Sequence, residues 1–80
     1  MNAPLQILAE FLEDAMKGIR EESARHWIRS AIRHLDEGDH PRHLAAASCC
    51  LREAARYTRR QDLRNWLQSL ASHLEREAWR

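Results

Sequence analysis

The sequence predicts an all-α fold in which four amphipathic helices form two tandem helical hairpins within a single domain, residues 1–80. Three observations lead to this prediction. Apolar side chains recur every three or four positions along most of the chain. The two prolines, Pro4 and Pro41, stand where helices would begin. Shifted by 39 positions, the chain also matches itself without a gap, which indicates a 39-residue pseudo-repeat.

The first hairpin is predicted over about residues 4–37. Its first helix would run from Pro4 to about Arg20, and its second would begin at Ser23, whose hydroxyl can accept from an unpaired helix amide. Gly38 then supplies a left-handed turn. The apolar stripes of the two helices are Leu5, Leu8, Leu12, Ala15, Met16 and Ile19, followed by Trp27, Ile28, Ala31, Ile32 and Leu35.

The second hairpin is predicted over about residues 41–78. Asp39 or His40 leads into its first helix, which has Pro41 in the first turn, and Asp62 is the expected cap of its second helix. The joint between these two helices is short, so they should be antiparallel. Their apolar stripes are Leu44, Ala47, Leu51, Ala54, Ala55 and Thr58, followed by Leu63, Trp66, Leu67, Leu70, Leu74 and Ala78.

The internal match is strongest between residues 24–35 and 63–74. Two amphipathic helices in phase match leucines by chance, but the pairing of Trp27 with Trp66 and of His34 with His73 does not follow from amphipathy. We interpret the pattern as a duplicated hairpin whose tryptophans meet in a shared interior. A single hairpin cannot bury its own stripe, so the two should pack as a compact four-helix bundle or as a short helical-repeat solenoid.

One flank of the first helix, and the same flank of the third, suggest a contact surface. Under the repeat the flank residues pair large with small, as Ile7 with Ala46, Phe11 with Cys50 and Gly18 with Tyr57. Either these flanks pack on each other inside the monomer, or they stay open and bind a second copy or another protein. Trp79 lies off the apolar face of the last helix and is a further candidate contact. The residues proposed for this surface are Ile7, Phe11, Cys50, Tyr57 and Trp79.

A second candidate surface is basic. Arg25, Arg29 and Arg33 recur at every fourth position and should line the outward side of the second helix, where they would bind a protein partner. In a symmetric dimer they would meet the acidic side of the first helix, namely Glu10, Glu13 and Asp14. A nucleic acid is the alternative partner, contacted by these three arginines together with Arg52, Arg56, Arg59, Arg60 and Arg64. With thirteen basic and twelve acidic side chains, the chain has almost no net charge, so its overall electrostatic field does not favour a nucleic acid.

Catalytic and metal chemistry are not predicted, and no cofactor is expected. Glu37 and His40 spell Glu-x-x-His, but that spacing ligates metal on a continuous helix and here it spans Gly38. His34 is expected to be a structural histidine bonded to a carbonyl. The sequence has no glycine-rich phosphate loop and no paired inward carboxylates. Cys50 is expected to be a small packing residue, whereas Cys49 projects outward and is a candidate redox-sensitive thiol.

The sequence therefore predicts a non-catalytic protein–protein interaction module, regulatory or adaptor in kind. A homodimer is expected, because a core of this size contributes only a few kcal/mol, about 3–5, on its own. The alternative is a nucleic-acid-binding accessory protein. Apolar stretches fall far short of the roughly 18 residues that a membrane span needs, so no membrane association is expected. The adjacent cysteines, too close for an ordinary disulfide framework, favour the reducing cytoplasm.

Overall fold

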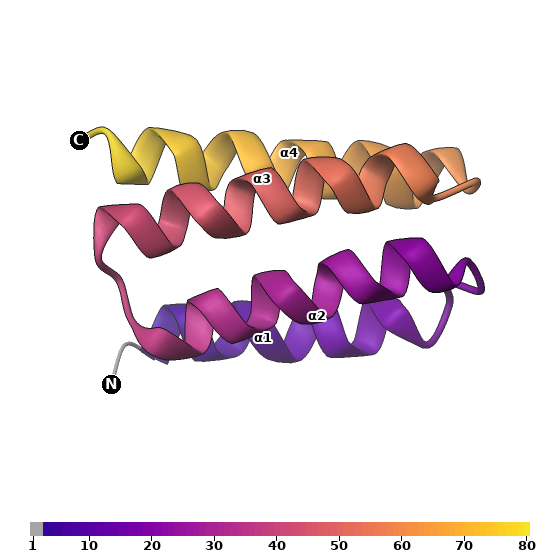
Figure 1. The fold of residues 1–80 in the computed structure, drawn as a ribbon, viewed down its shortest axis with the longest axis horizontal. Coiled ribbons are helices and arrows are strands. Elements are labelled where there is room, and N and C mark those ends of the chain that lie inside the picture. Colours follow the sequence, from indigo (N-terminus) through magenta and orange to yellow (C-terminus); the bar gives the residue numbers. More distant parts are fainter. Residues whose placement is uncertain (1–2) are drawn as a thin grey trace.

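Four antiparallel helices make up the chain in the computed structural model, which describes residues 3–80 (Figure 1). The helices are α1 (Ala3–Met16), α2 (Glu22–Glu37), α3 (Pro41–Tyr57) and α4 (Gln61–Ala78). Between residues 3 and 80 there is no strand. The predicted all-α fold with four helices is thus confirmed. None of these helices has the length and apolar character required to cross a membrane.

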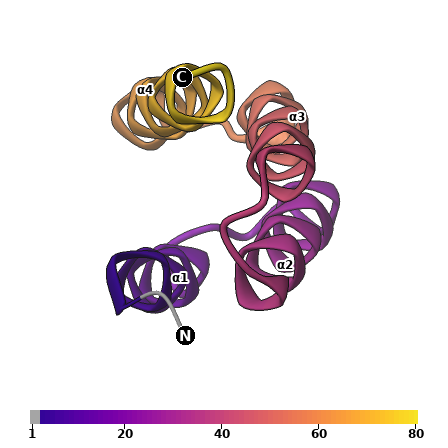
Figure 2. The same ribbon diagram turned by 90° about the vertical axis from the view of Figure 1, so that its left-hand side faces the viewer.

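Consecutive helices are neighbours in space. α1 packs on α2, α2 on α3, and α3 on α4. Viewed along the helices, they occupy four corners, and the wider side lies between α1 and α4 (Figure 2). This packing is consistent with a four-helix bundle. α1 and α3 lie at diagonal corners, so the expectation that their flanks pack on each other inside the monomer is wrong.

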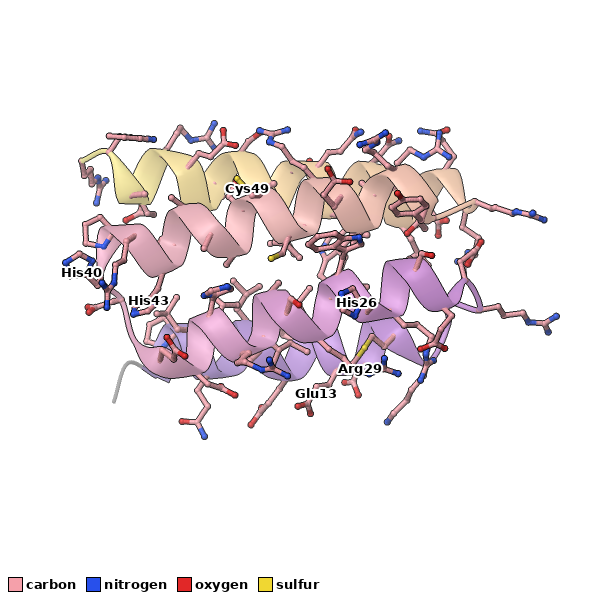
Figure 3. The ribbon with its side chains drawn as sticks, in the orientation of Figure 1. Glu13, His26, Arg29, His40, His43 and Cys49 are labelled. Atoms are coloured by element: carbon pink, nitrogen blue, oxygen red, sulfur yellow. The ribbon has the colours of Figure 1, made fainter. Side chains whose placement is uncertain are left out.

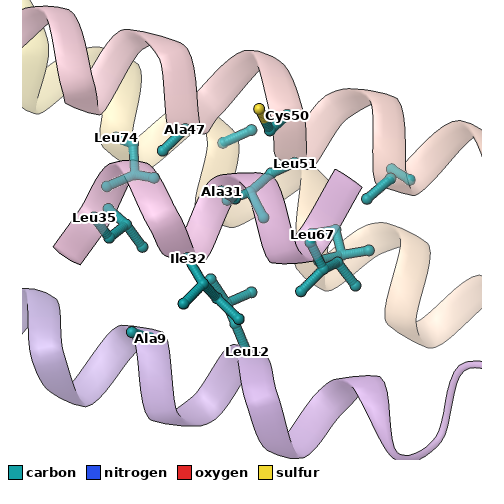
Figure 4. Packing of buried hydrophobic residues seen from close by; sticks show 14 of the residues in the cluster. Ala9, Leu12, Ala31, Ile32, Leu35, Ala47, Cys50, Leu51, Leu67 and Leu74 are labelled. Carbon is teal, nitrogen blue, oxygen red and sulfur yellow. The ribbon is translucent and has the colours of Figure 1, made fainter. Parts of the chain in front are cut away.

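Leucine and isoleucine side chains from all four helices fill the interior (Figure 4). Small side chains on α2 and α3, such as Ala31 and Ala47, are fully buried and let these two central helices approach closely. Truncation of a buried leucine to alanine typically costs about 2–5 kcal/mol, which is a large part of the stability of a domain of this size. The largest fully buried apolar side chains are Leu12, Ile28, Leu51, Leu67 and Leu74.

The duplicated hairpin is visible in how each hairpin turn is closed. Arg25 Nη1 donates to the carbonyl of Ile19 at 3.3 Å and to that of Met16 at 2.9 Å. In the second hairpin, Arg64 Nη2 donates to the carbonyl of Thr58 at 2.8 Å. Arg25 and Arg64 are equivalent under the 39-residue shift, and so are Ile19 and Thr58. We call Arg25 and Arg64 the turn arginines; their shared role supports the repeat independently of the leucine pattern.

Trp27 and Trp66 are similarly buried, as the repeat predicted, but the expectation that they meet in a shared interior is wrong. They project from α2 and α4, which lie at diagonal corners, and no ring contact joins them within residues 3–80. Both are half-buried and pack against the buried core. Neither is fully buried, because leucine and alanine side chains already fill the centre of the bundle. His34 and His73 do not match in this way, since His34 is half-buried and His73 is exposed. The two hairpins are therefore equivalent in backbone and core but not in every polar side chain.

Three helix ends differ from the sequence-based expectation. α1 ends at Met16 rather than near Arg20, because Gly18 and Ile19 donate to carbonyls only three residues back, as in a tight terminal turn. α2 begins one residue before Ser23, and α4 begins one residue before Asp62. Neither Ser23 nor Asp62 is therefore the cap.

The turn between α2 and α3 agrees with expectation. Gly38 has φ 136°, a conformation that side chains disfavour, and its amide donates to the carbonyl of Leu35. His40 caps α3, since its Nδ1 accepts from the amide of Arg42 at 3.2 Å, and Pro41 occupies the first turn. At the other end of the bundle, Glu21 Oε1 accepts from the amide of Arg59 at 3.1 Å. The two hairpins are thus linked at both ends.

Candidate interaction surfaces

Helix α1 carries two large apolar side chains on its outer side. Ile7 is 51% exposed and Phe11 is 58% exposed. They are four residues apart and therefore adjacent on the helix surface. Ala9 and Leu12, on the opposite side of the helix, are buried against the rest of the bundle. We call Ile7 and Phe11 the α1 face. Because α1 packs mainly against α2 and lies at an open corner, residues 3–80 cover only about half of this face.

Tyr57 and Trp79 are exposed as well, but at opposite ends of the bundle. Tyr57 is 44% exposed and is the last residue of α3, beside the α3–α4 turn. Trp79 is 83% exposed and follows the last residue of α4, at the end where α1 begins (Figure 1). It forms one wall of an open hollow lined by Ser72, Glu75 and Arg76. The expected surface residues therefore do not form one continuous patch.

Cys50 does not belong to the predicted contact surface. Its side chain is only 7% exposed and packs in the core (Figure 4). Burial raises the pKa of the Cys50 thiol, and the adjacent Cys49 raises it further. Cys50 is therefore the small packing residue that its position on α3 suggested. Cys49 is exposed, and both thiols are free.

The three arginines in the row on α2 make different contacts. Arg25 turns toward the carbonyls that close the first hairpin and is only partly exposed, so it is a structural residue rather than a free contact. Arg29 Nη1 lies 3.1 Å from Glu22 Oε1 in an exposed ion pair. Within residues 3–80, Arg33 makes no ion pair or hydrogen bond and is exposed. Only Arg33 therefore presents an unpaired charge on this side of α2.

Most side chains in the second group of arginines, around the α3–α4 turn, are also engaged within the chain. Arg56 pairs with Glu53 at 3.2 Å, Arg60 pairs with Asp62 at 2.6 Å, and Arg64 is a turn arginine. The backbone amide of Arg59 donates to Glu21 Oε1. The pKa of Glu21 is lowered mainly by a hydrogen bond from its own backbone amide and next by this hydrogen bond from Arg59. A nucleic acid phosphate would have to compete with these acceptors for most of the cluster.

Arg52 belongs to a polar network that joins α3 to α4. Arg52 Nε donates to Glu75 Oε1 at 2.7 Å, and Arg52 Nη2 donates to Glu75 Oε2 at 3.0 Å. The buried Ser48 hydroxyl lies within hydrogen-bonding distance of the carbonyl of Ala71 at 2.9 Å and of Glu75 Oε1 at 2.8 Å. Arg52 and then Ser48 lower the pKa of Glu75 to about 2. The network therefore holds a charged carboxylate at the α3–α4 contact.

The histidines near the α2–α3 turn are arranged differently from the sequence-based expectation. Glu37 pairs with His43, with Oε2 3.2 Å from Nδ1, rather than with His40. His34 stands beside them, 6.1 Å from His43 between ring centroids. Its Nδ1 is buried without a hydrogen-bond partner among the described residues, so the expected carbonyl bond is absent there. Figure 3 shows His40 and His43 at this end of the bundle.

The Glu-x-x-His motif does not predict the grouping of His34, Glu37 and His43, because these residues come from two different helices. His34 and Glu37 are three residues apart and share one side of the last turns of α2. His43 lies in the first turn of α3, and the short turn through Gly38 places it against them. The signal available in the sequence was thus the combination of an i, i+3 pair with a tight helix–helix turn.

Comparisons of this chain with protein-family models, with curated proteins and with solved structures found no match. The functional argument therefore rests on the residues of the chain itself.

Proposed function

We propose that this chain is a non-catalytic interaction module, regulatory or adaptor in kind, that forms a homodimer through the α1 face. The observation that carries the proposal is the pair of exposed side chains, Ile7 and Phe11, on a helix that packs mainly against one neighbour. Apolar surface removed from water stabilises a contact by roughly 25 cal/mol per Å². A second copy related by a two-fold axis would cover this face with its own α1.

The charges around the α1 face support a protein partner. Glu10 and Asp14 are exposed on the outer side of α1, close to Ile7 and Phe11 along the helix. Arg33 of α2 offers a charge of the opposite sign that no acceptor in residues 3–80 engages. In a symmetric dimer each copy contributes both signs, which favours one orientation of the two chains.

Nucleic acid binding has weaker support. Of the eight arginines that were candidates for it, only Arg33 and Arg59 have side chains that make no hydrogen bond or ion pair within residues 3–80. The guanidinium groups of the other six would each exchange an existing contact for a phosphate, which reduces the gain that binding can deliver.

The properties of the two cysteine thiols support a non-catalytic role and a cytoplasmic location. A cysteine nucleophile reacts as the thiolate, and burial raises the pKa of Cys50 and so disfavours that form. The free Cys49 is compatible with a reducing compartment.

The mass of the assembly in solution tests the proposed homodimer. Light scattering coupled to size-exclusion chromatography should give twice the 9.4 kDa mass of the chain. Phe11→Glu should shift the mass to that of the monomer with unchanged helix content, because the charge would be buried in the interface. Tyr57→Glu is the matched control, since Tyr57 is also an exposed aromatic residue but lies away from the α1 face. A monomeric wild type, or a Phe11→Glu variant that remains dimeric, would contradict the proposal.

A further inference from the structure

We infer that His34, Glu37 and His43 form a binding site for a divalent transition-metal ion of the zinc type. One ligand atom from each of the three side chains lies within 4.8 Å of the other two. Two imidazoles and one carboxylate are a donor set that zinc prefers, and three protein ligands leave one position for water.

The separations between these donors suit such an ion. Tetrahedral ligands at the usual zinc distances are about 3.3 Å apart, as simple geometry gives from bond lengths near 2.0–2.1 Å. Glu37 Oε2 and His43 Nδ1 already have this spacing, at 3.2 Å. Since one donor atom from each residue lies within 4.8 Å of the other two, side-chain adjustment is enough to bring all three to coordination distance.

The backbone holds the three donors together without help from an ion. His34 and Glu37 project from the last turns of α2, which ends at Gly38. His43 projects from the first turn of α3, whose start is fixed by the His40 cap and Pro41. Two of the donors therefore come from the first hairpin and one from the second, and a bound ion would fasten the joint between them. Such preorganisation reduces the ordering that metal binding requires.

His34 supplies the second, independent observation. Its Nδ1 is buried and has no hydrogen-bond partner in the part of the chain that the structure describes. Buried polar atoms are nearly always satisfied, and an unsatisfied one indicates a missing water, ion or ligand. An ion bound by this imidazole, with its coordinated water, would bring a polar partner close to a nitrogen that otherwise has none within residues 3–80.

The second hairpin contains a natural control for this site. Under the 39-residue shift His34 corresponds to His73, but Glu37 corresponds to Arg76. A cation in place of the carboxylate repels a metal ion, and His73 is exposed. Metal binding is therefore expected at the α2–α3 joint alone, and His73 can be changed without affecting it.

The test uses the full chain without an affinity tag, stripped of metal with a chelator and titrated with Zn²⁺ by calorimetry and with Co²⁺ by visible absorption. We expect one ion per chain, a Co²⁺ spectrum typical of tetrahedral coordination, and a Tm that rises with Zn²⁺ concentration. His34→Gln, Glu37→Gln and His43→Gln should each weaken Zn²⁺ binding by at least about tenfold, by comparison with the effect of losing even a supporting partner of a ligand. His73→Gln and Cys49→Ser should bind as tightly as the wild type.

Several results would overturn the inference. One is the absence of Zn²⁺ binding at micromolar concentrations of the chain, and another is an unchanged Zn²⁺ affinity in the three ligand variants. A third is the loss of Zn²⁺ binding in Cys49→Ser, which would indicate an adventitious thiol site. The metal-free Tm of each variant shows whether it folds, and Glu37→Gln, an exposed and nearly isosteric change, keeps the test valid if a histidine variant does not. Because these readouts do not depend on the mass of the assembly, the result is separate from that for the proposed homodimer.

Discussion

At the scale of single residues, the turn arginines show most directly how side chains fix this fold. Helix ends leave carbonyls without partners, and those at the end of α1 and α3 face the start of the next helix. Arg25 and Arg64 each reach back six residues to one of these carbonyls. A guanidinium can serve several acceptors at fixed geometry, which suits it to closing a turn. Arg25 therefore contributes to stability rather than to a free basic surface.

Replacing Arg25 should measure this contribution. Arg25→Met keeps the length of the side chain but removes the side-chain donor to the carbonyl of Ile19. It also removes one of the two donors to the carbonyl of Met16, which still accepts from the amide of Ile19. We expect the free energy of unfolding to fall by about 1–2 kcal/mol, the usual effect of losing a partly buried hydrogen bond from a charged donor. Urea denaturation followed by circular dichroism gives this value.

Arg33→Met is the matched control. Arg33 lies on the same helix, is exposed and has no partner among residues 3–80, so its replacement should change stability by less than about 0.5 kcal/mol. Equal losses in the two variants would show that Arg25 does not close the turn.

Residue-level chemistry was the least predictable part of this protein from its sequence. Periodicity places Arg25 and Arg33 in one row, yet the end of α1 recruits Arg25 alone. In the same way, Ser23 and Asp62 have the composition of caps, but each helix starts one residue earlier and Asp62 pairs with Arg60. Such choices depend on where the backbone of a neighbouring turn lies, which local sequence does not specify.

At the scale of elements, α3 and α4 are joined by apolar packing and by the network around Glu75. The buried Ser48 on α3 and the half-exposed Arg52 one turn later both contact this carboxylate on α4. Their hydrogen bonds require the charged form of Glu75, which is why the pKa of Glu75 falls from the ordinary 4.5 to about 2. The contact between these helices should therefore depend on pH.

The sign of that dependence follows from the direction of the shift. Because the pKa of Glu75 is lower in the folded chain than in the unfolded chain, its contribution is complete above pH 4.5. The contribution should be lost as the pH falls from 4.5 toward 2, where the folded chain also takes up the proton. Urea denaturation of the wild type across this range should show the loss. Glu75→Gln should be less stable near neutral pH and should lose less stability in acid.

Two arginine variants separate this cause from general acid effects. Arg52→Gln should reduce the acid sensitivity as Glu75→Gln does, because Arg52 is the main reason for the lowered pKa. Arg56→Gln is the control, since Arg56 pairs with Glu53 and not with Glu75. If Glu75→Gln and the wild type lose stability in parallel below pH 4.5, the network does not carry the effect.

At the scale of the whole molecule, the sequence predicted the four helices, their antiparallel order and the repeat, because apolar periodicity specifies which side of each helix is buried. It left open the choice between bundle and solenoid. That choice depends on how α1 and α4 are placed across the molecule, which the apolar stripe of each helix does not specify. It also assigned Phe11 and Cys50 to equivalent flanks of the first and third helices, whereas Cys50 is buried and Phe11 is exposed.

The open corner of the bundle at α1 is what links the fold to the proposed homodimer. α2 and α3 are central and each has two helix neighbours, whereas α1 has mainly one. An outer helix with an uncovered apolar side gains most from a second copy of the chain, which completes its burial.

The most direct test of the homodimer is nuclear magnetic resonance on a sample that mixes isotope-labelled and unlabelled chains, with filtering for contacts between copies. The proposed dimer predicts intermolecular signals between the Ile7 methyl groups and the Phe11 ring, which should disappear on dilution to the monomer. Intermolecular signals that arise only from Tyr57 or Trp79, or none at a concentration where the mass is that of a dimer, would contradict it.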